Sequence, residues 1–428
     1  MASFLRRALC LVILGALTVL MAPLHAQPTA PLSDARTAYT DGDYERAIER
    51  LRRSAATDTS AQALYLLGRS YQALVQHAPA LKALENAYRL DSTSVRILQA
   101  KGQSYEALSR FDAAESAYAG ALELEPSRTL HLALAGLYHQ VRSWKEATYH
   151  YRVVLRSDTT NSLLHARLAQ TLQAQHRTED ALTHYRRAHQ LNPRDASVTL
   201  SLSRLLEQQG QPDAAAAVVD STLHYRETAA LWTRRATLAF RQDNLPAARH
   251  GYQRAIQQGD SSASTFRRLG IAEVGQGRYD AALDALHHAV ERDSSNVHTH
   301  FYLGVAYREV DSLDHAEASF EETITRVAND VLVDAYVQSA VTYDAQGQLR
   351  RAIDAYKTAL RVQPGRVEIY FHLATLYDDY YRDKTTAALY YRKFLAAADS
   401  VETPFHAYAT NRLDALRPIL HFQQGRTN

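Results

Sequence analysis

The sequence contains little cysteine, glycine or proline for its length. Its 428 residues include one cysteine, 16 glycines and 11 prolines. Cys10 lies in an N-terminal stretch that we expect to be removed, so the rest of the chain has neither disulfides nor thiol chemistry. The scarcity of helix-breaking residues favours one extended helical array over several loop-rich domains.

The sequence also lacks an excess of charge of either sign. Lysine and arginine number 48 and aspartate and glutamate 46, and the difference is accounted for by Arg6 and Arg7 near the N-terminus. A chain without net charge has no long-range field that attracts it to nucleic acid or to anionic lipid. Hydrophobic residues make up 46%, which is enough to build a core. We therefore expect a folded protein that does not bind nucleic acid.

The N-terminal residues 1–26 have the pattern of a secretory signal peptide. Arg6 and Arg7 precede an uncharged apolar run over residues 8–21, and a proline and the small residue Ala26 follow it. We expect cleavage after Ala26 and export to the periplasm or the extracellular space. An uncleaved leader that anchors the chain is the alternative, although the apolar run is shorter than the roughly 20 residues that span a bilayer. No second candidate span follows it, so we expect no transmembrane segment once the leader is removed.

An alanine recurs at a nearly fixed spacing along the chain. The spacing is 33 or 34 residues, and it widens to 36 and 35 at the last two intervals. The eleven positions are Ala47, Ala80, Ala114, Ala147, Ala181, Ala215, Ala248, Ala282, Ala316, Ala352 and Ala387. A period of this length is typical of an array in which each unit packs on its neighbours.

Each of these alanines has two companions in its unit. A large apolar residue follows four positions later, and a small residue precedes it by twelve positions, or by thirteen in the last unit; Gly270, Ala282 and Leu286 are one such set. Positions four apart share a helix face, so the later pair lies on one helix and the small residue on an earlier one. The small residue allows the two helices to approach closely, and the large one fills the remaining space. Each unit is therefore predicted to be a pair of short helices.

Residues typical of turns and helix caps lie within and between the predicted helix pairs. A left-handed turn residue is expected at the end of the first helix, five positions before the alanine, where glycine recurs at Gly42, Gly210, Gly277 and Gly347. Aspartate followed by serine or threonine stands between units, and its side-chain oxygens are predicted to cap the next helix. These aspartates are Asp58, Asp91, Asp158, Asp260 and Asp293.

The repeated unit resembles the tetratricopeptide repeat. The clearest copy begins with Phe266-Arg-Arg-Leu-Gly270, continues with Gly277-Arg-Tyr279-Asp-Ala-Ala282 and ends with Leu286 and Ala289. The resemblance implies an all-α, right-handed superhelical solenoid of antiparallel helix pairs. Together with the signal-peptide pattern over residues 1–26, it predicts about eleven units over 27–400 and a C-terminal capping helix and tail over 401–428.

Two regions depart from the repeat pattern. The sixth unit has Ser203 where the family has glycine or alanine, and Pro212 where it has an aromatic residue. After the last unit, an amphipathic segment over residues 408–420 is predicted to cover the final hydrophobic face. Its apolar residues are Leu413, Leu416 and Leu420, and Arg412 and Arg417 are expected to lie on its outer side.

The 19 histidines do not indicate a metal site. His287 and His288 are adjacent on a helix and point about 100° apart, so they do not form an ordinary ligand pair. His131, His165 and His300 fall where the family has its first aromatic residue, so their rings are expected to pack there. The sequence contains no metalloprotease, serine hydrolase, nucleotide or dinucleotide motif. We therefore predict neither a cofactor nor an enzyme; a binder of glycan or lipid, or an enzyme built on histidines, is the minor alternative.

The resemblance also suggests a binding groove. In the family, the second, fifth, ninth and twelfth positions of each first helix line the inner wall. In repeats two to five these positions form a mostly neutral polar wall, which includes Tyr65, Arg69, Gln99, Leu163 and Gln170. In repeats eight to eleven they form an apolar stripe edged with acid. The predicted groove residues of that stripe are Ile271, Val274, Phe301, Val305, Arg308, Val337, Val341, Asp344, Phe371 and Asp378.

The predicted function is a scaffold that binds proteins or extended peptides through this groove. The apolar stripe would accept a segment with apolar anchors and basic flanks, with Phe301 and Phe371 as its main contacts. A superhelix that closes tightly enough to bury the stripe is the alternative for the site. A passive architectural solenoid, or an envelope assembly component without a groove ligand, is the alternative for the function.

Overall fold

The computed structural model describes residues 30–54, 60–326, 330–381, 384–398 and 404–424. These residues form 23 helices and no strand, so the predicted all-α fold class is confirmed. The predicted leader over residues 1–26 and the predicted cap residue Asp58 lie outside the described residues. None of the described helices combines the length and the apolarity that a membrane crossing requires.

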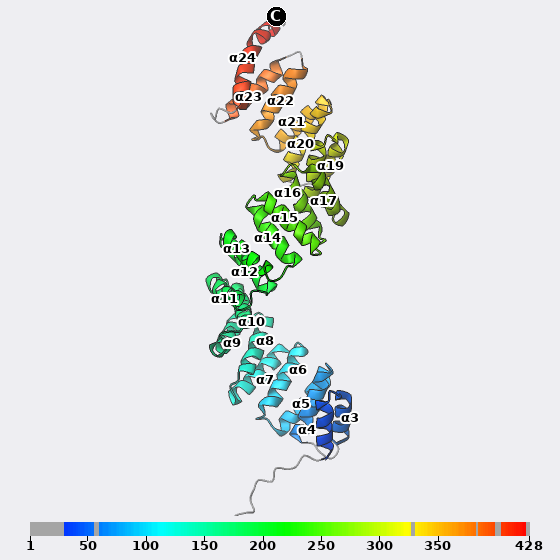
Figure 1. The fold of residues 1–428 in the computed structure, drawn as a ribbon, viewed down its shortest axis with the longest axis vertical. Helices are drawn as coiled ribbons and strands as arrows, with labels where there is room; N and C mark the ends of the chain where they lie inside the picture. The colour runs from blue at the N-terminus through cyan, green and yellow to red at the C-terminus, as the bar shows by residue number, and fades with distance from the viewer. Residues whose placement is uncertain (1–29, 55–59, 327–329, 382–383, 399–403, 425–428) are drawn as a thin grey trace, which may run out of the picture. The chain divides into compact units, whose positions relative to one another are not determined.

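The chain divides into two compact units, residues 1–191 and 192–428. Unit 1 contains α2 (Ala30–Thr40), α3 (Tyr44–Ser54), α4 (Ala61–Ala73), α5 (His77–Leu90), α6 (Val95–Ala107), α7 (Phe111–Leu124), α8 (Arg128–Gln140), α9 (Trp144–Ser157), α10 (Ser162–Ala174) and α11 (Thr178–Leu191). Each even-numbered helix is the first helix of a repeat and the following one is its second helix, so unit 1 holds repeats one to five (Figure 1).

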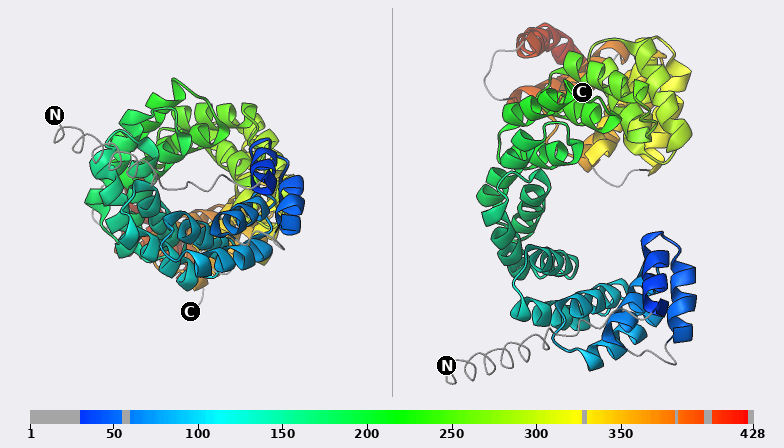
Figure 2. Two further views of the ribbon diagram at one scale, coloured as in Figure 1. Left: turned by 90° about the horizontal axis from the view of Figure 1, so that it is seen from below. Right: turned by 60° about the horizontal axis from the view of Figure 1, so that its bottom comes forward.

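Unit 2 holds repeats six to eleven and one additional helix, α24. Its helices are α12 (Ala196–Gln208), α13 (Pro212–Leu223), α14 (Ala229–Arg241), α15 (Leu245–Gln257), α16 (Ala263–Val274), α17 (Tyr279–Arg292), α18 (Val297–Glu309), α19 (Leu313–Arg326), α20 (Asp330–Ala345), α21 (Leu349–Val362), α22 (Val367–Tyr380), α23 (Thr385–Ala397) and α24 (Pro404–Gln424). Within each unit, the helices lie in side-by-side pairs, and each pair stacks on the next (Figures 1 and 2).

The predicted pairing of small and large residues positions the two helices of a repeat. A Cβ atom at Gly102 would lie 2.4 Å from Cε1 of Tyr118, and one at Gly304 would lie 2.6 Å from Cε1 of Phe320. Both distances are far inside van der Waals contact, so no larger residue fits without moving the ring. The buried Tyr118 and Phe320 rings thus lie directly on the glycine of the first helix, which confirms the predicted close approach.

The turns between the two helices of a repeat use the left-handed backbone conformation. Gly42, Gly210, Gly277 and Gly347 all have positive φ angles, between 69° and 80°, as the sequence predicted. At the same turn in six other repeats, residues with side chains adopt φ angles of 57° to 61°. These residues are Val75, Ser109, Arg142, His176, Asp243 and Asp311.

The four aspartates between repeats that the structure describes do not cap the following helix, so the prediction was wrong for them. Asp260 Oδ1 accepts a hydrogen bond from the backbone N–H of Ser262 at 3.0 Å, so it closes the loop that precedes the cap. Ser262 is the N-cap of α16, and its hydroxyl accepts from the N–H of Thr265. Asp91 and Asp293 likewise end a second helix as its C-cap. The linker between the second helix of one repeat and the first helix of the next extends beyond the aspartate. The residue that caps the next helix therefore comes two or three positions after it.

The additional helix α24 packs against repeat eleven. Leu416 is fully buried, and Leu413 and Leu420 pack against the same core cluster, which includes Tyr391 and Phe394 of α23. The apolar face predicted for residues 408–420 therefore covers the last repeat. The helix is longer than predicted, because it begins at Pro404 and ends at Gln424.

Candidate binding surface on the first helices

The surface formed by consecutive first helices is the candidate site, and we call it the first-helix face. Its residues are those at the second, fifth, ninth and twelfth positions of each first helix. In unit 1, α2, α4 and α6 surround a hollow of about 770 Å³ on this face. Its floor is apolar, with Leu32, Leu66 and Ile97, and Tyr39 and Tyr65 stand on its walls. We call this site the N-terminal hollow.

The rim of the N-terminal hollow is positively charged. Arg36 of α2 and Arg96 of α6 line it, and both are exposed. No carboxylate of the described residues forms an ion pair with either guanidinium. The one lining acid, Asp91, accepts hydrogen bonds from the N–H and hydroxyl of Thr93. Both arginines are therefore available for an anionic group, which planar guanidinium forks bind well.

Polar side chains fix the spacing of α4 and α6 next to the hollow. Arg69 Nη1 donates to Gln103 Oε1 at 3.2 Å. Gln72 Nε2 donates to the carbonyl oxygen of Ala100 and to Ser104 Oγ, both at 2.7 Å. The polar wall predicted for these repeats is thus partly engaged in contacts between neighbouring repeats.

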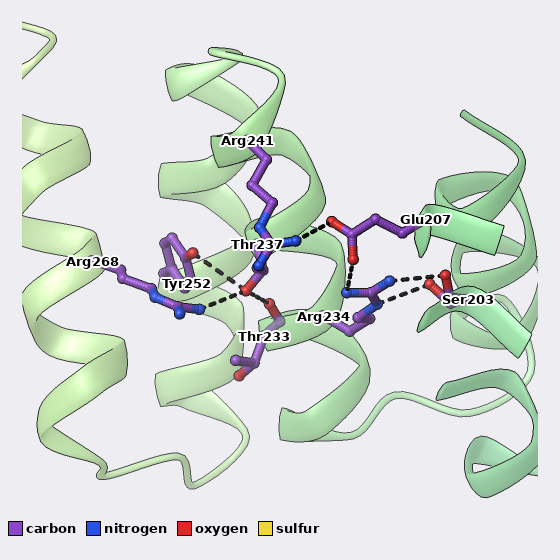
Figure 3. Close-up of polar contacts among 8 residues, drawn as sticks. All are labelled: Ser203, Glu207, Thr233, Arg234, Thr237, Arg241, Tyr252 and Arg268. Carbon is purple, nitrogen blue, oxygen red and sulfur yellow. Dashed lines mark hydrogen bonds and ion pairs between the residues drawn. The ribbon is translucent and has the colours of Figure 1, made fainter. Parts of the chain in front are cut away.

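In unit 2, an arginine network joins the first helices of repeats six and seven (Figure 3). Arg234 of α14 has a side chain only 10% exposed, and its Nη1 forms an ion pair with Glu207 of α12 at 2.8 Å. Its Nε and Nη2 donate to the hydroxyl and the carbonyl oxygen of Ser203, each at 2.9 Å. Arg241 Nη1 contacts the other oxygen of Glu207 at 2.7 Å. Burial raises the pKa of Glu207, but the two arginines outweigh it and hold the pKa below its usual value.

Sequence reasoning noted Ser203 only as a departure from the repeat pattern and missed this network. The structure gives the reason for the departure. Ser203 is fully buried, and its small side chain and main-chain carbonyl receive the Arg234 guanidinium. The next repeat has a similar contact, in which Arg268 Nη1 of α16 donates to Thr237 Oγ1 of the preceding first helix at 3.0 Å (Figure 3). Arginines at the sixth position of two successive first helices were the signal that could have revealed the network.

The apolar stripe predicted for repeats eight to eleven is half-buried. Val274, Val337 and Val341 pack against the core clusters of their repeats. The Phe301 ring lies 6.0 Å from that of Phe320, edge to face. The partly buried members of the predicted groove are Ile271, Val274, Phe301, Val305, Arg308, Val337, Val341 and Phe371. Because these side chains pack against the cores of their repeats, the stripe exposes less apolar surface than predicted.

Phe371 and Asp378 were predicted as groove residues, but the structure engages them with the end of the chain. The Phe371 ring centroid lies 5.0 Å from that of Phe405 of α24 and 5.3 Å from that of Phe394. Asp378 is 2% exposed, and its Oδ2 accepts from Arg412 Nε of α24 at 2.6 Å. Asp378 is therefore unavailable to a partner. Arg412, which was predicted to lie outside, follows it by 34 residues, so α24 occupies the place of a twelfth first helix.

The charges around Asp378 are matched, whereas those around Asp344 are not. Burial raises the pKa of Asp378, but Arg412 and Lys384 outweigh it and hold the pKa below its usual value. Asp344 remains exposed, as predicted. Partial burial and repulsion from Asp379 raise its pKa. The predicted acidic edge also included Asp334, Glu368 and Asp379. Arg366 forms ion pairs with Asp334 and Glu368, so Asp344 and Asp379 are the acids of that edge for which no ion pair is described.

The described residues contain no group of three or more histidine, cysteine, aspartate or glutamate side chains placed to hold a metal ion.

Comparisons with known proteins identify the repeat. Two family models described as tetratricopeptide repeat match the chain, one over residues 172–238 and the other over 100–162, 267–331 and 338–402. A model described as subunit 3 of the anaphase-promoting complex, or cyclosome, matches residues 23–87. No curated protein matches the chain.

Several solved structures are similar to this chain at low sequence identity. One is YrrB, described as a TPR protein with an unusual peptide-binding site, at 21% identity over 43% of this chain and 95% of that one, with a TM-score of 0.40. A second is the C-terminal part of a TPR repeat-containing protein from Cytophaga hutchinsonii, at 16% identity over 55% and 96%, with a TM-score of 0.45. A third is yeast Tom70, at 12% identity over 92% and 98%, with a TM-score of 0.36. With family matches over more than half of its residues, and with eleven helix pairs among the described residues, the chain belongs to the tetratricopeptide-repeat family.

Proposed function

We propose that this chain is a scaffold that binds an extended protein segment in the N-terminal hollow. The observation that carries the proposal is the combination of an apolar floor with two arginines, Arg36 and Arg96, that no described carboxylate neutralises. A volume of about 770 Å³ accommodates several side chains of a peptide. The hollow therefore fits a segment that carries an apolar anchor and at least one carboxylate.

The positive charge of the rim determines the sign of the charge that the partner carries. Arginine binds carboxylates through two parallel hydrogen bonds, which fixes the orientation of the bound group. The apolar floor of Leu32, Leu66 and Ile97 supplies the burial from which most binding energy at such surfaces comes. An acidic, extended segment satisfies both, whereas a basic segment would be repelled by Arg36 and Arg96.

The first-helix face of repeats eight to eleven is the second candidate, as the sequence predicted. Its exposed acids, Asp344 and Asp379, favour a basic segment. Its apolar residues are half-buried, so they offer less surface than a set of free anchors would. We therefore place the principal site in unit 1. The peptide-binding site in the description of YrrB concerns that protein, and our proposal rests on the residues of this chain.

We also propose that the protein is exported. The support is the order of charged, apolar and small residues over positions 1–26. N-terminal sequencing of the protein from an extracytoplasmic fraction should give Gln27 as the first residue. A protein that starts at Met1 in that fraction would contradict cleavage and favour the uncleaved anchor.

Peptide selection tests the binding proposal directly. A library of linear peptides displayed on phage would be selected against the chain, and enriched peptides would be measured individually by fluorescence anisotropy. We expect peptides with an acidic residue close to an apolar one. The double variant Arg36→Glu and Arg96→Glu should bind them at least about tenfold more weakly and with a smaller salt dependence.

A matched control separates the hollow from general surface charge. Arg204 in unit 2 is exposed and occupies the same repeat position as Arg36. Arg204→Glu should leave peptide affinity unchanged. If no peptide is enriched, or if the control weakens binding as much as the double variant, the hollow is not the site and the passive architectural role is favoured.

A further inference from the structure

Repeat four contains a pair of histidines in direct contact. The Nδ1 atoms of His131 on α8 and His150 on α9 lie 2.8 Å apart. His150 is 8% exposed, and its ring stacks on that of Tyr138 with the planes 17° apart. The contact joins the two helices of the repeat.

Repeat five contains the same pair at the same positions. His165 on α10 and His184 on α11 follow the first pair by 34 residues, and their Nδ1 atoms lie 2.9 Å apart. The other ring nitrogen of His165, Nε2, lies 3.2 Å from the carbonyl oxygen of Thr159. Because a carbonyl only accepts, Nε2 carries a proton, and in the neutral ring Nδ1 of His165 accepts from His184.

The geometry limits how many protons each pair can hold. A distance of 2.8 to 2.9 Å between two nitrogens has room for one hydrogen, which one ring donates and the other accepts. The donor ring can take up a proton on its remote nitrogen. The acceptor ring can bind an additional proton only at Nδ1, because its Nε2 is already protonated. A proton there would clash with the hydrogen that already lies between the two Nδ1 atoms. Each closed pair therefore binds at most one additional proton, whereas two separated histidines bind two.

The charged groups around the first pair leave it without a strong anionic partner. From α7, Glu115 accepts a hydrogen bond from the hydroxyl of Tyr138, so it is engaged with that ring. Glu146 of α9 also acts on Tyr138. From α10, Arg167 adds positive charge near Tyr151 of α9. Burial and the neighbouring His131 lower the pKa of His150 to about 4, and burial also lowers the pKa of His131.

The second pair has positive charge beside it. Burial, His165 and Arg152 of α9 all lower the pKa of His184, and only Asp180 of α11 opposes them. Arg152 is therefore the group from the preceding repeat that resists a charge on this pair. The two pairs thus respond to acid in the same direction.

We propose that repeats four and five form an acid-sensitive segment, in which the α8–α9 and α10–α11 helix hairpins open when their histidine pairs are forced to accept a second proton. The sign follows from proton linkage. Opened hairpins bind more protons than closed ones below the ordinary histidine pKa, so their closed state loses stability as the pH falls from about 6.5 to about 4. This proposal does not depend on the proposed peptide site.

The expected size of the effect can be derived for His150. A pKa of about 4 in the closed hairpin and 6.5 when open increases the ratio of open to closed forms about 30-fold between pH 7.5 and pH 5. Hydrogen exchange followed by mass spectrometry would measure this ratio for each helix, after correction for the intrinsic pH dependence of exchange. We expect peptides from α8 to α11 to lose protection on acidification by at least about tenfold more than peptides from α4 to α7.

Variants and a spectroscopic measurement make the test decisive. The double variant His150→Gln and His184→Gln removes one ring of each pair. It should abolish most of the additional loss of hydrogen-exchange protection that α8 to α11 show on acidification. The control His298→Gln, at an exposed histidine of α18, should leave that loss unchanged. If the double variant does not fold, long-range ¹⁵N spectra of histidine-labelled chain supply the answer. Spectra in which no more than one ring of each pair becomes cationic as the pH falls to about 5 would support the proposal. Uniform loss of protection along unit 1, or titration of all four rings near pH 6.5, would overturn it.

Discussion

The first-helix faces at the start and at the end of the array use the same repeat positions with opposite outcomes. In repeats one to three, Arg36 and Arg96 border an open hollow without described ion-pair partners. In repeat eleven, Asp378 lies at another position of the first-helix face, but it is 2% exposed and held by Arg412 of α24. Repeat position alone therefore does not make a residue available for binding. The charge supplied by the next helix decides it.

The largest effect that tests this comparison is expected at Asp378. Asp378→Ala removes the buried carboxylate that both Arg412 and Lys384 contact. Although the two cations are partly exposed, the loss should destabilise the end of unit 2 by about 3 kcal/mol. Hydrogen exchange of α22 to α24 would measure the loss. The adjacent and exposed Asp379 provides the control, because Asp379→Ala should change stability by less than about 0.5 kcal/mol. Equal effects of the two variants would show that α24 is not held by this pair.

The Asp378 contact also gives a pH dependence of its own. Its pKa is held below the usual value by the arginine and lysine, despite the opposing effect of burial. The stability that it provides is therefore present above the ordinary aspartate pKa and is lost as the pH falls through the lowered value in the folded state. Wild type and Asp378→Ala should accordingly converge in stability only in strong acid.

The second-largest effect is expected at Phe371. The sequence indicated a binding anchor whose loss would spare the fold, but in the structure its ring packs against Phe394, Phe405 and Tyr408. Phe371→Ala should therefore destabilise repeat eleven by about 2 to 3 kcal/mol. Phe405 is 56% exposed, and Phe405→Ala should cost less than half as much. If thermal unfolding of the Phe371 variant is unchanged, the ring is free and the groove interpretation is restored.

The repeat architecture was predictable because it depends on local spacing. Eleven in-phase alanines, the small residues before them and the large ones after them determine how two helices of one repeat meet, as Gly102 and Tyr118 show. The positive φ of Gly277 follows from the same register. Contacts of this kind lie within one period of the chain, so a single unit contains the information that specifies them.

The candidate site was predicted less well because it depends on contacts between repeats. Whether Asp378 faces a partner depends on Arg412, one full period later and in a helix that the sequence presented only as a cap. The role of Ser203 depends in the same way on Arg234 of the following repeat. The N-terminal hollow was missed because residues such as Arg36 and Tyr39 form it only together with α4 and α6.

The turns of the two units sharpen the comparison further. Of the five turns within repeats of unit 1, only that at Gly42 has glycine in the left-handed conformation, whereas Val75 adopts it with φ of 59° and is β-branched. Val75→Gly should therefore stabilise repeat two by about 1 kcal/mol, as measured by urea unfolding. In unit 2, Asp243→Gly should gain less, because aspartate tolerates this conformation better. Destabilisation by Val75→Gly would mean that the exposed valine contributes contacts that outweigh its strain.

The smallest expected effect concerns Asp344. Partial burial and the nearby Asp379 raise its pKa, so its charge is unfavourable in the folded state. Asp344→Asn should increase stability at neutral pH by no more than about 0.5 kcal/mol, since solvent screens the repulsion. The gain should fade as the pH falls through the carboxylate range, because the wild-type group then becomes neutral as well. A loss of stability in the variant at neutral pH would show that the carboxylate has a favourable partner.

The position of helix α24 affects whether copies of the protein can associate head to tail at high concentration. It occupies the place of a twelfth first helix and buries Leu416 against the outer surface of repeat eleven. A chain that ended after α23 would leave that apolar surface uncovered, where a helix of another copy could pack. Such a head-to-tail contact does not close on itself, so it would propagate into filaments. By covering this surface, the final helix removes one route to head-to-tail polymerisation.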